Sequence, residues 1–460
     1  MGNNSSNGHP QLTTPNKSFQ NLLDKAQSEL KSCNYLLALK TYKKIEKQMS
    51  EKSIKEKKAL ASLYQVIAMI YSKQARHPKA MDYLNKAMEL GADETPEGKW
   101  FTATVWKDLG TIYSAQENYD QALESFEKML EISSMLGNNE GELLVADSYR
   151  EISGVYRKVG KYEESLGALS TAYNIKMKKV EEDDLSIADI YDDFGLICQE
   201  KGKDSEALSY FKKALNIRTK KHGNKHDDIM KSLILIASLY KGQKQYKQAL
   251  HYYNLISNIL FRKPSPNQEI SYNLYEGLGF IYMGMGNDGD SLCCYMKALE
   301  ICHKSFGKIH PNVAKVYDHM GHVYESCKRL PDALKCFKKA VDIRVKVMDE
   351  AYLSIASIYQ SISSVCKELG KESEAESAMK RASIVAERGY MRNRLWARSE
   401  IPMSNLTLID VDKEIDTKVN CVNETNWQSQ ASEFDGKGDT GKEQRARADT
   451  LESIDTPIKI

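Results

Sequence analysis

A small side chain recurs along this 460-residue chain at an almost constant interval. Seven of the eight intervals between these positions are 42 residues long, and one is 43. The nine anchor positions are Ala26, Ala68, Gly110, Ser153, Gly195, Ala237, Gly279, Gly321 and Ser363. Self-similarity at a fixed period of this size is typical of stacked supersecondary units, each of which contacts mainly its neighbours. The sequence therefore predicts a repeat array.

Other residues repeat in register with the anchor. Tyrosine or cysteine follows most anchors by three residues, alanine or serine follows by twelve, and a large residue follows by sixteen, as at Tyr113, Ala122 and Phe126. Apolar residues at helical spacing on both sides of a short break indicate two amphipathic helices per unit. Short side chains let two helix axes approach closely, and we expect the aromatic residue to fill the space around that crossing. The predicted fold is all-α, without a β-sheet.

Glycine and proline mark the breaks between units. Glycine ends several apolar helical runs, where we expect a left-handed C-terminal cap. These residues are Gly91, Gly137, Gly223 and Gly307. Pro96 and Pro311 stand where the next helix is expected to start, a position that tolerates a missing N–H group.

The pattern of a small anchor, Tyr three later, Ala twelve later and Phe or Tyr sixteen later resembles the tetratricopeptide repeat. The resemblance covers residues 18–387 and implies an α-solenoid, a right-handed superhelix of about nine helix pairs. A tetratricopeptide unit usually has about 34 residues. The longer unit here, and the segment Gly307-Lys-Ile-His-Pro-Asn-Val-Ala314, are similar to the kinesin light chain type, with a weaker match at 223–229.

The chain also departs from that type. Asp192-Asp193 and Asp318-His319 stand where such repeats often carry paired asparagines. We expect no counterpart of the heptad coiled coil of a kinesin light chain, because about 17 residues of this sequence precede the first unit. We therefore expect repeats of the kinesin light chain type in a protein that is not itself a kinesin light chain.

Three segments lie outside the expected array of residues 18–387. Residues 1–17 are polar, and residues 400–460 carry thirteen acidic and seven basic residues without the period. Both are expected to be disordered. Residues 388–399 are arginine-rich around Trp396. They are expected to form a capping helix over the last unit, with a basic docking patch as the alternative.

Composition narrows the function classes. The formal net charge of +2 gives no electrostatic reason to expect nucleic acid as a partner. No apolar stretch is long enough for a membrane span, and no secretory signal is present, so we expect a cytoplasmic protein. The chain has no phosphate-cradling glycine loop, nucleophile elbow or His-Glu-x-x-His motif. We expect neither an enzyme nor a cofactor.

The nine cysteines are scattered, and we expect reduced, structural thiols. Cys293, Cys294, Cys302 and His303 form the one local cluster, whose spacing matches no zinc-ligand pattern. No metal site is therefore expected.

The favoured function is a noncatalytic scaffold or adaptor that binds peptide segments of partner proteins. The alternative is a structural subunit of a large cytoskeletal, ciliary or cargo-transport assembly. The resemblance implies that the first helix of each unit lines the concave face, and positions three before and four after the anchor share a helix face. The candidate groove residues are Lys107, Arg150, Arg157, Asp192, Lys241, Glu276, Asp318 and Glu325. Basic residues dominate the earlier units, so acidic peptides are expected to prefer that half; solvated surface charges are the alternative interpretation.

Two modification sites are also predicted. Gly2 follows Met1, with Ser6 at the favoured position for N-myristoylation. One such chain supports at most weak, reversible membrane association. Thr450 follows Arg445 and Arg447 in the arrangement that basophilic kinases favour. Phosphorylation there would add about −1.5 to −2 charges to an acidic tail.

Overall fold

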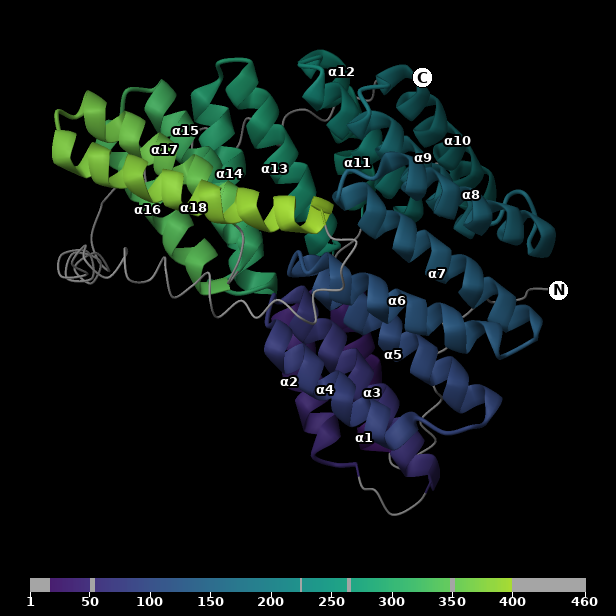
Figure 1. Cartoon of the computed structure of the whole chain (residues 1–460). Helices are drawn as coiled ribbons and strands as arrows, with labels where there is room; N and C mark the ends of the chain where they lie inside the picture. Colours follow the sequence, from purple (N-terminus) through teal and green to yellow (C-terminus); the bar gives the residue numbers. More distant parts are fainter. Residues whose placement is uncertain (1–16, 50–53, 224–225, 263–265, 348–351, 399–460) are drawn as a thin grey trace. The chain divides into compact units, whose positions relative to one another are not determined.

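The computed structural model describes residues 17–49, 54–223, 226–262, 266–347 and 352–398. Every helix or strand assigned within these ranges is an α-helix, and there are eighteen of them. Successive helices pack as pairs, one pair for each predicted unit (Figure 1). The predicted all-α solenoid of nine helix pairs is confirmed. Gly2, Thr450 and, apart from Lys17, the segments 1–17 and 400–460 lie outside the described residues.

Each unit consists of a first, odd-numbered helix and a second, even-numbered helix. The first helices are α1 (Lys17–Lys31), α3 (Ile54–Lys73), α5 (Pro96–Ala115), α7 (Asn139–Lys158), α9 (Leu185–Glu200), α11 (Asp227–Gly242), α13 (Gln268–Gly284), α15 (Pro311–Ser326) and α17 (Tyr352–Glu368). The second helices are α2 (Tyr35–Glu46), α4 (His77–Gly91), α6 (Tyr119–Ser134), α8 (Tyr162–Lys179), α10 (Asp204–His222), α12 (Tyr246–Leu260), α14 (Asp288–Ser305), α16 (Leu330–Val347) and α18 (Glu372–Arg398). The arginine-rich segment from residue 388 to 398 continues α18 without a break.

Helix starts follow the proline signals. Pro96 opens α5 behind Thr95, whose hydroxyl accepts a hydrogen bond from the Gly98 N–H at 3.1 Å. Pro311 opens α15 behind His310. Among the described helices, none is both long and apolar enough to cross a bilayer.

Glycine caps three of the four predicted helix ends. Gly137, Gly223 and Gly307 have positive φ angles of 61°, 77° and 100°. The same prediction for Gly91 is wrong. Gly91 is the last residue of α4 and lacks a positive φ, and an added Cβ would overlap the ring of Phe101. Close approach of the next helix, and not a left-handed cap, therefore requires glycine at this position.

The anchor residue and the aromatic residue sixteen positions later meet at the helix crossing, as predicted. A Cβ added to Gly195 would lie 2.5 Å from Cε1 of Phe211, closer than real Cβ contacts come. The same relation holds for Gly110 with Phe126, Gly279 with Tyr295 and Gly321 with Phe337. The missing side chain therefore lets the second helix set its ring directly against the backbone of the first helix.

Where serine replaces alanine or glycine at this crossing, its hydroxyl group forms a hydrogen bond. The Ser165 hydroxyl donates to the Ser153 carbonyl oxygen of the partner helix at 2.8 Å. Ser291 donates to Gly279 O, and Ser363 to Ala375 O, each at 2.8 Å. A buried hydroxyl without such a partner would cost free energy, so serine is tolerated here because a carbonyl lies opposite.

The turn between the two helices of a unit has a residue with positive φ at the same position in all nine units. The residue seven positions after each anchor has a positive φ, between 55° and 80°. Four of these residues are glycines: Gly160, Gly202, Gly286 and Gly370. The other five are Cys33, Ala75, Glu117, Lys244 and Lys328. The left-handed conformation is costly for residues with a Cβ, so five units carry local backbone strain that a glycine would relieve.

The first two units also contact the seventh and eighth units, more than 200 residues away. Gln268 N–H donates to Ser32 O at 3.0 Å, and the Tyr35 hydroxyl donates to Glu269 Oε2 at 2.9 Å. The Tyr35 ring lies against Phe306, with ring centroids 5.4 Å apart. Lys73, at the end of α3, forms an ion pair with Glu269 at 3.3 Å. We call this set the closing contact.

Candidate functional site

The first helices form the inner layer of the array. Each first helix from α3 to α13 also contacts the first helix of the following unit. No two consecutive second helices among the described residues approach one another as closely. In a curved stack, the layer whose members lie closer together is the concave layer. All eight candidate groove residues lie on this layer, between α5 and α15.

Polar side chains link successive first helices along the inner layer from α3 to α15. Five links join residues about one period apart: Gln65 with Asp108, Lys107 with Glu151, Arg150 with Asp193, Arg157 with Glu200, and Asp189 with Lys231. Two further links run through Glu276, to Lys241 on α11 and to Lys315 on α15. We call this set the inner ladder, because each link joins one first helix to the next.

The basic half of the predicted groove is paired with acidic residues of the following unit. Lys107 Nζ lies 3.3 Å from Glu151 Oε1. Among the described residues, Arg150 bonds Asp193 through Nε alone, so its two Nη nitrogens retain donors for a ligand. Burial opposes charge on Arg150, but Asp193 and neighbouring carboxylates raise its pKa further above the usual range. The positive charge is therefore held in place, and its side chain remains 28% exposed.

Asp192 serves a structural pairing. Its side chain is 3% exposed, and Oδ2 accepts a bond from Arg218 Nη2 at 2.7 Å. Arg218 comes from the second helix α10, and the same nitrogen also bonds Asp189 at 2.7 Å. Burial raises the pKa of Asp192 to about 6, although Arg218 acts in the opposite direction. Asp192 therefore joins the two helices of its unit and offers little surface to a ligand.

Glu276 lies at the centre of a second buried group. The carboxylate is 8% exposed and has Lys241 at 3.5 Å, Lys315 at 3.1 Å and His319 at 3.6 Å. Burial opposes ionisation, but the two lysines and His319 hold the pKa of Glu276 below its usual value. Burial lowers the pKa of His319 to about 4, so this imidazole is neutral near pH 7. Glu276 therefore ties α11, α13 and α15 together.

The last two candidates, Asp318 and Glu325, lie on either side of His322 on α15. His322 Nδ1 is 3.3 Å from Glu325 Oε2, and its Nε2 is 3.9 Å from Asp318 Oδ1. Burial raises the pKa of Asp318. The structure thus brings these two carboxylates together around one imidazole, on the same helix as Lys315.

Two of the three cysteines in the cluster on α14 lie in the interior. Cys294 and Cys302 are buried, and burial raises the pKa of each thiol to about 12. Both thiols pack in the interior of the helix pairs, as predicted for structural cysteines.

Several functional partners were missed in the sequence. Glu151, Asp193 and Glu200 each lie one period after a basic candidate and pair with it. Opposite charges separated by 43 or 44 residues are the signal that would have found them. Because stacking brings equivalent positions of neighbouring units together, opposite charges about one period apart also lie close together.

Comparison with known proteins gives distant structural neighbours, and among curated proteins none matches the sequence. A Rap protein complexed with Competence and Sporulation Factor is 13% identical, with a TM-score of 0.53 over 82% of this chain and 100% of that one. A Rap conjugation gene regulator of plasmid pLS20, in complex with the Phr* peptide, is 17% identical, with a TM-score of 0.49 over 84% and 99%. Kinesin light chain TPR-like repeats from Podosopora anserina are 17% identical, with a TM-score of 0.35 over 44% and 94%.

The family is shown by sequence models of the repeat. Models described as tetratricopeptide repeat match residues 61–93, 101–178, 144–220, 186–260 and 313–387. These matches cover more than half of the chain and coincide with the helix pairs α3–α4, α5 to α12 and α15–α18. The chain belongs to the tetratricopeptide repeat family.

Proposed function

We propose that the protein is a noncatalytic scaffold or adaptor, and that its inner layer binds peptide segments of partner proteins. The observation that carries the proposal is the inner ladder. It places charged side chains at the same register on consecutive first helices, and these side chains stay partly exposed while they pair from one unit to the next. Repeat arrays commonly bind their partners on such concave surfaces.

The half of the ladder on α5 and α7 is the proposed site for an acidic peptide. Lys107 stands on α5, and Arg150 and Arg157 stand seven residues apart on α7. Their present partners are carboxylates, so a peptide carboxylate would replace or share a partner of the same chemistry. Arginine suits this exchange because its guanidinium group can hold two carboxylates at once. Asp192 and Glu276 are proposed to support the site, since both are buried.

The solved Rap protein neighbour is in complex with Competence and Sporulation Factor. That complex supports the idea that an array of this fold can hold a partner. We propose that the partners of this chain are proteins recognised through short segments. Nucleic acid is not proposed as a partner, because the net charge is +2. The proposed location is the cytoplasm, with weak membrane association only if Gly2 is myristoylated.

A peptide array probed with the full chain tests the proposal. The wild type is expected to select short acidic sequences, and Arg150→Glu is expected to lose them. The double variant Arg150→Glu with Asp193→Arg restores an ion pair with reversed direction, so it separates loss of binding from loss of stability. Lys178→Glu, at an exposed position on the second helix α8, is the control that changes the same charge outside the inner layer.

Binding by the single variant equal to that of the wild type would place the site elsewhere. A wild-type protein that selects no short sequence, and instead purifies within a large complex, would support the alternative of a structural subunit in an assembly.

A further inference from the structure

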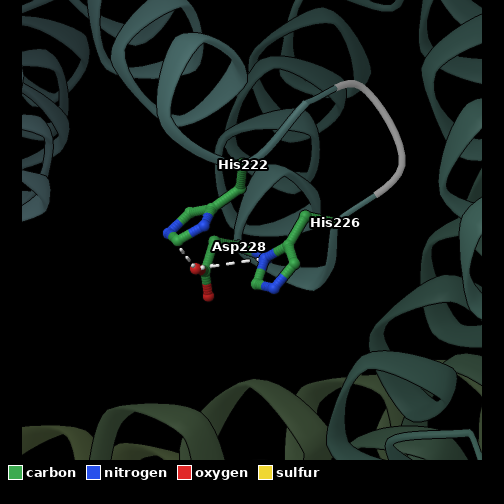
Figure 2. A group of neighbouring side chains, drawn as sticks. All are labelled: His222, His226 and Asp228. Atoms are coloured by element: carbon green, nitrogen blue, oxygen red, sulfur yellow. Dashed lines mark hydrogen bonds and ion pairs between the residues drawn. The ribbon is translucent and has the colours of Figure 1, made fainter. Parts of the chain in front are cut away.

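Two histidines and an aspartate converge where the fifth unit ends and the sixth begins. His222 is the last residue of α10, and His226 and Asp228 belong to the start of α11 (Figure 2). Asp228 Oδ2 lies 3.2 Å from His222 Nε2 and 3.2 Å from His226 Nδ1. One ligand atom from each residue lies within 4.8 Å of the others. Three donors of metal-ligand chemistry thus face a common point.

An equivalent set two periods later shows what this arrangement is built from. Phe306, His310 and Asn312 each follow His222, His226 and Asp228 by 84 residues. In both places the histidine caps the first helix: Nδ1 accepts from Asp228 N–H at 3.3 Å, and from Asn312 N–H at 3.1 Å. In both places it stacks on the preceding ring at an interplanar angle of 19°.

The capping histidine and its stacked ring are therefore shared by these two breaks, and at the later break no second histidine or carboxylate of the set accompanies the cap. What differs at the earlier break is that His222 replaces the phenylalanine and Asp228 replaces the asparagine. Each replacement turns a side chain that cannot bind a metal well into one that can. Neither replacement is needed for the cap, which uses only His226 and a backbone N–H.

We propose that His222, His226 and Asp228 bind a divalent transition-metal ion of the zinc class. Two imidazole nitrogens and one carboxylate oxygen are ligands that zinc and its neighbours prefer over magnesium or calcium. With metal–ligand bonds of about 2.0–2.1 Å, ligand atoms of a tetrahedral site lie about 3.3 Å apart. The two nitrogen–oxygen separations of 3.2 Å match that spacing. Water would complete the coordination.

Binding requires a local movement of a histidine ring, because the one lone pair of His226 Nδ1 cannot both accept the Asp228 N–H and bind a metal ion. The two rings are stacked with centroids 4.3 Å apart, and parallel ring planes cannot both contain one metal ion. One imidazole must therefore turn about its Cβ–Cγ bond. The movement is inexpensive because the side chains of His222 and His226 are 29% and 47% exposed. The bound ion would tie the end of α10 to the start of α11, across the break between two units.

Zinc titration of the full chain, after removal of metals by a chelator, tests the proposal. The wild type is expected to bind zinc, with a rise in melting temperature because the ion binds only the folded arrangement. The variant His222→Phe with Asp228→Asn recreates the residues of the later break and keeps the His226 cap. Its zinc affinity is expected to fall at least about tenfold, since even outer-shell changes cost 10–100-fold.

His251→Phe, which removes an exposed histidine on α12, is the matched control and should bind zinc as the wild type does. Protection of the site's histidines from diethylpyrocarbonate, mapped by mass spectrometry, is a local measurement that is independent of stability. Zinc should protect His222 and His226 and leave His251 reactive. Equal zinc affinity in the double variant and the wild type, no protection by zinc, or equal binding of magnesium would each overturn the proposal.

Discussion

The Nε2–H group of His310 donates a hydrogen bond to the backbone carbonyl of Lys73, 237 residues earlier in the chain, across 3.1 Å. The other ring nitrogen, Nδ1, accepts the Asn312 N–H that caps α15. Because Nδ1 must accept, the one ring proton has to reside on Nε2. A second proton, on Nδ1, would face the Asn312 N–H and remove the cap. His310 therefore supports the closing contact only as a neutral imidazole.

The closing contact is expected to weaken in acid. Burial lowers the pKa of His310 to about 4, while the bond to the Lys73 carbonyl and the charge of Glu269 act in the opposite direction; nearby His77 and Lys73 lower it further. Between about pH 6.5 and 4 the unfolded chain therefore binds a proton that the folded chain excludes. The stabilisation is complete above pH 6.5 and falls with pH, by at most about 2 kcal/mol between pH 7.5 and pH 5.

His310→Asn keeps a good N-cap and removes the titration. Chemical denaturation at both pH values should give a smaller loss of stability for this variant than for the wild type. His319 titrates in the same direction in both proteins and cancels in the comparison. An equal loss in the two proteins would show that His310 does not titrate as its surroundings imply.

Glycine is expected to stabilise the strained turns. Lys244, which is exposed, and Ala75 have φ angles of 58° and 55°. Replacing either with glycine removes the Cβ clash of the left-handed conformation and should raise the free energy of unfolding by about 0.5–1 kcal/mol. Lys244→Ala keeps the Cβ and should bring no such gain. Gly202→Ala, at the same turn of the fifth unit, should lower stability by a similar amount in a thermal or urea melt.

Gly195 and Phe211, which meet at the helix crossing, are expected to be energetically coupled. Gly195→Ala should destabilise the protein by about 1–3 kcal/mol, because the Phe211 ring must move away from the new methyl group. Phe211→Leu should make the same glycine change less costly, so a double-mutant cycle should report positive coupling. Gly154→Ala on α7 is the control: nothing lies within 4 Å of its Cβ, and it should stabilise by about 0.5–1 kcal/mol. If the stability effects of Gly195→Ala and Phe211→Leu were strictly additive, the contact between these two residues at the crossing would be contradicted.

Glu276→Gln is expected to destabilise the array by about 2–3 kcal/mol, because it leaves the ammonium of Lys241 poorly compensated near the interior. Glu163→Gln offers a comparison on an exposed pair with Lys201, and should cost clearly less, because solvent screens an exposed pair. Urea denaturation of both variants measures the difference. If both variants lost equally little stability, Glu276 would be acting as a surface charge.

The periodic features of the sequence predicted most of the fold. The anchor and its aromatic partner, as at Gly195 and Phe211, could be predicted because each pairing lies inside one unit and recurs in many. The left-handed turn was also visible, as glycine seven residues after four anchors, but charged residues such as Glu117 and Lys244 hid it in other units. Gly91 was misjudged because a glycine that admits a neighbouring ring looks the same in sequence as a glycine that caps a helix.

The candidate site was less predictable. The helix face of Arg150 followed from its register, but its partner Asp193 depends on how one unit lies on the next, which register alone does not determine. Burial also could not be inferred: Asp192 and Glu276 occupy the same register as Lys107, yet both carboxylates are buried. The paired histidines 222 and 226 became informative only beside the Phe306–His310 stack.

The closing contact has a consequence for how such a chain can change over generations. An open array tolerates the gain or loss of whole units, since each touches only its neighbours. Here four units, the third to the sixth, separate the two that carry Ser32 and Lys73 from the two that carry Gln268 and His310. Duplicating or deleting any of the four would leave Lys73 without its imidazole. The closing contact therefore fixes the number of units between these residues, whereas a unit added after α16 would leave the contact intact.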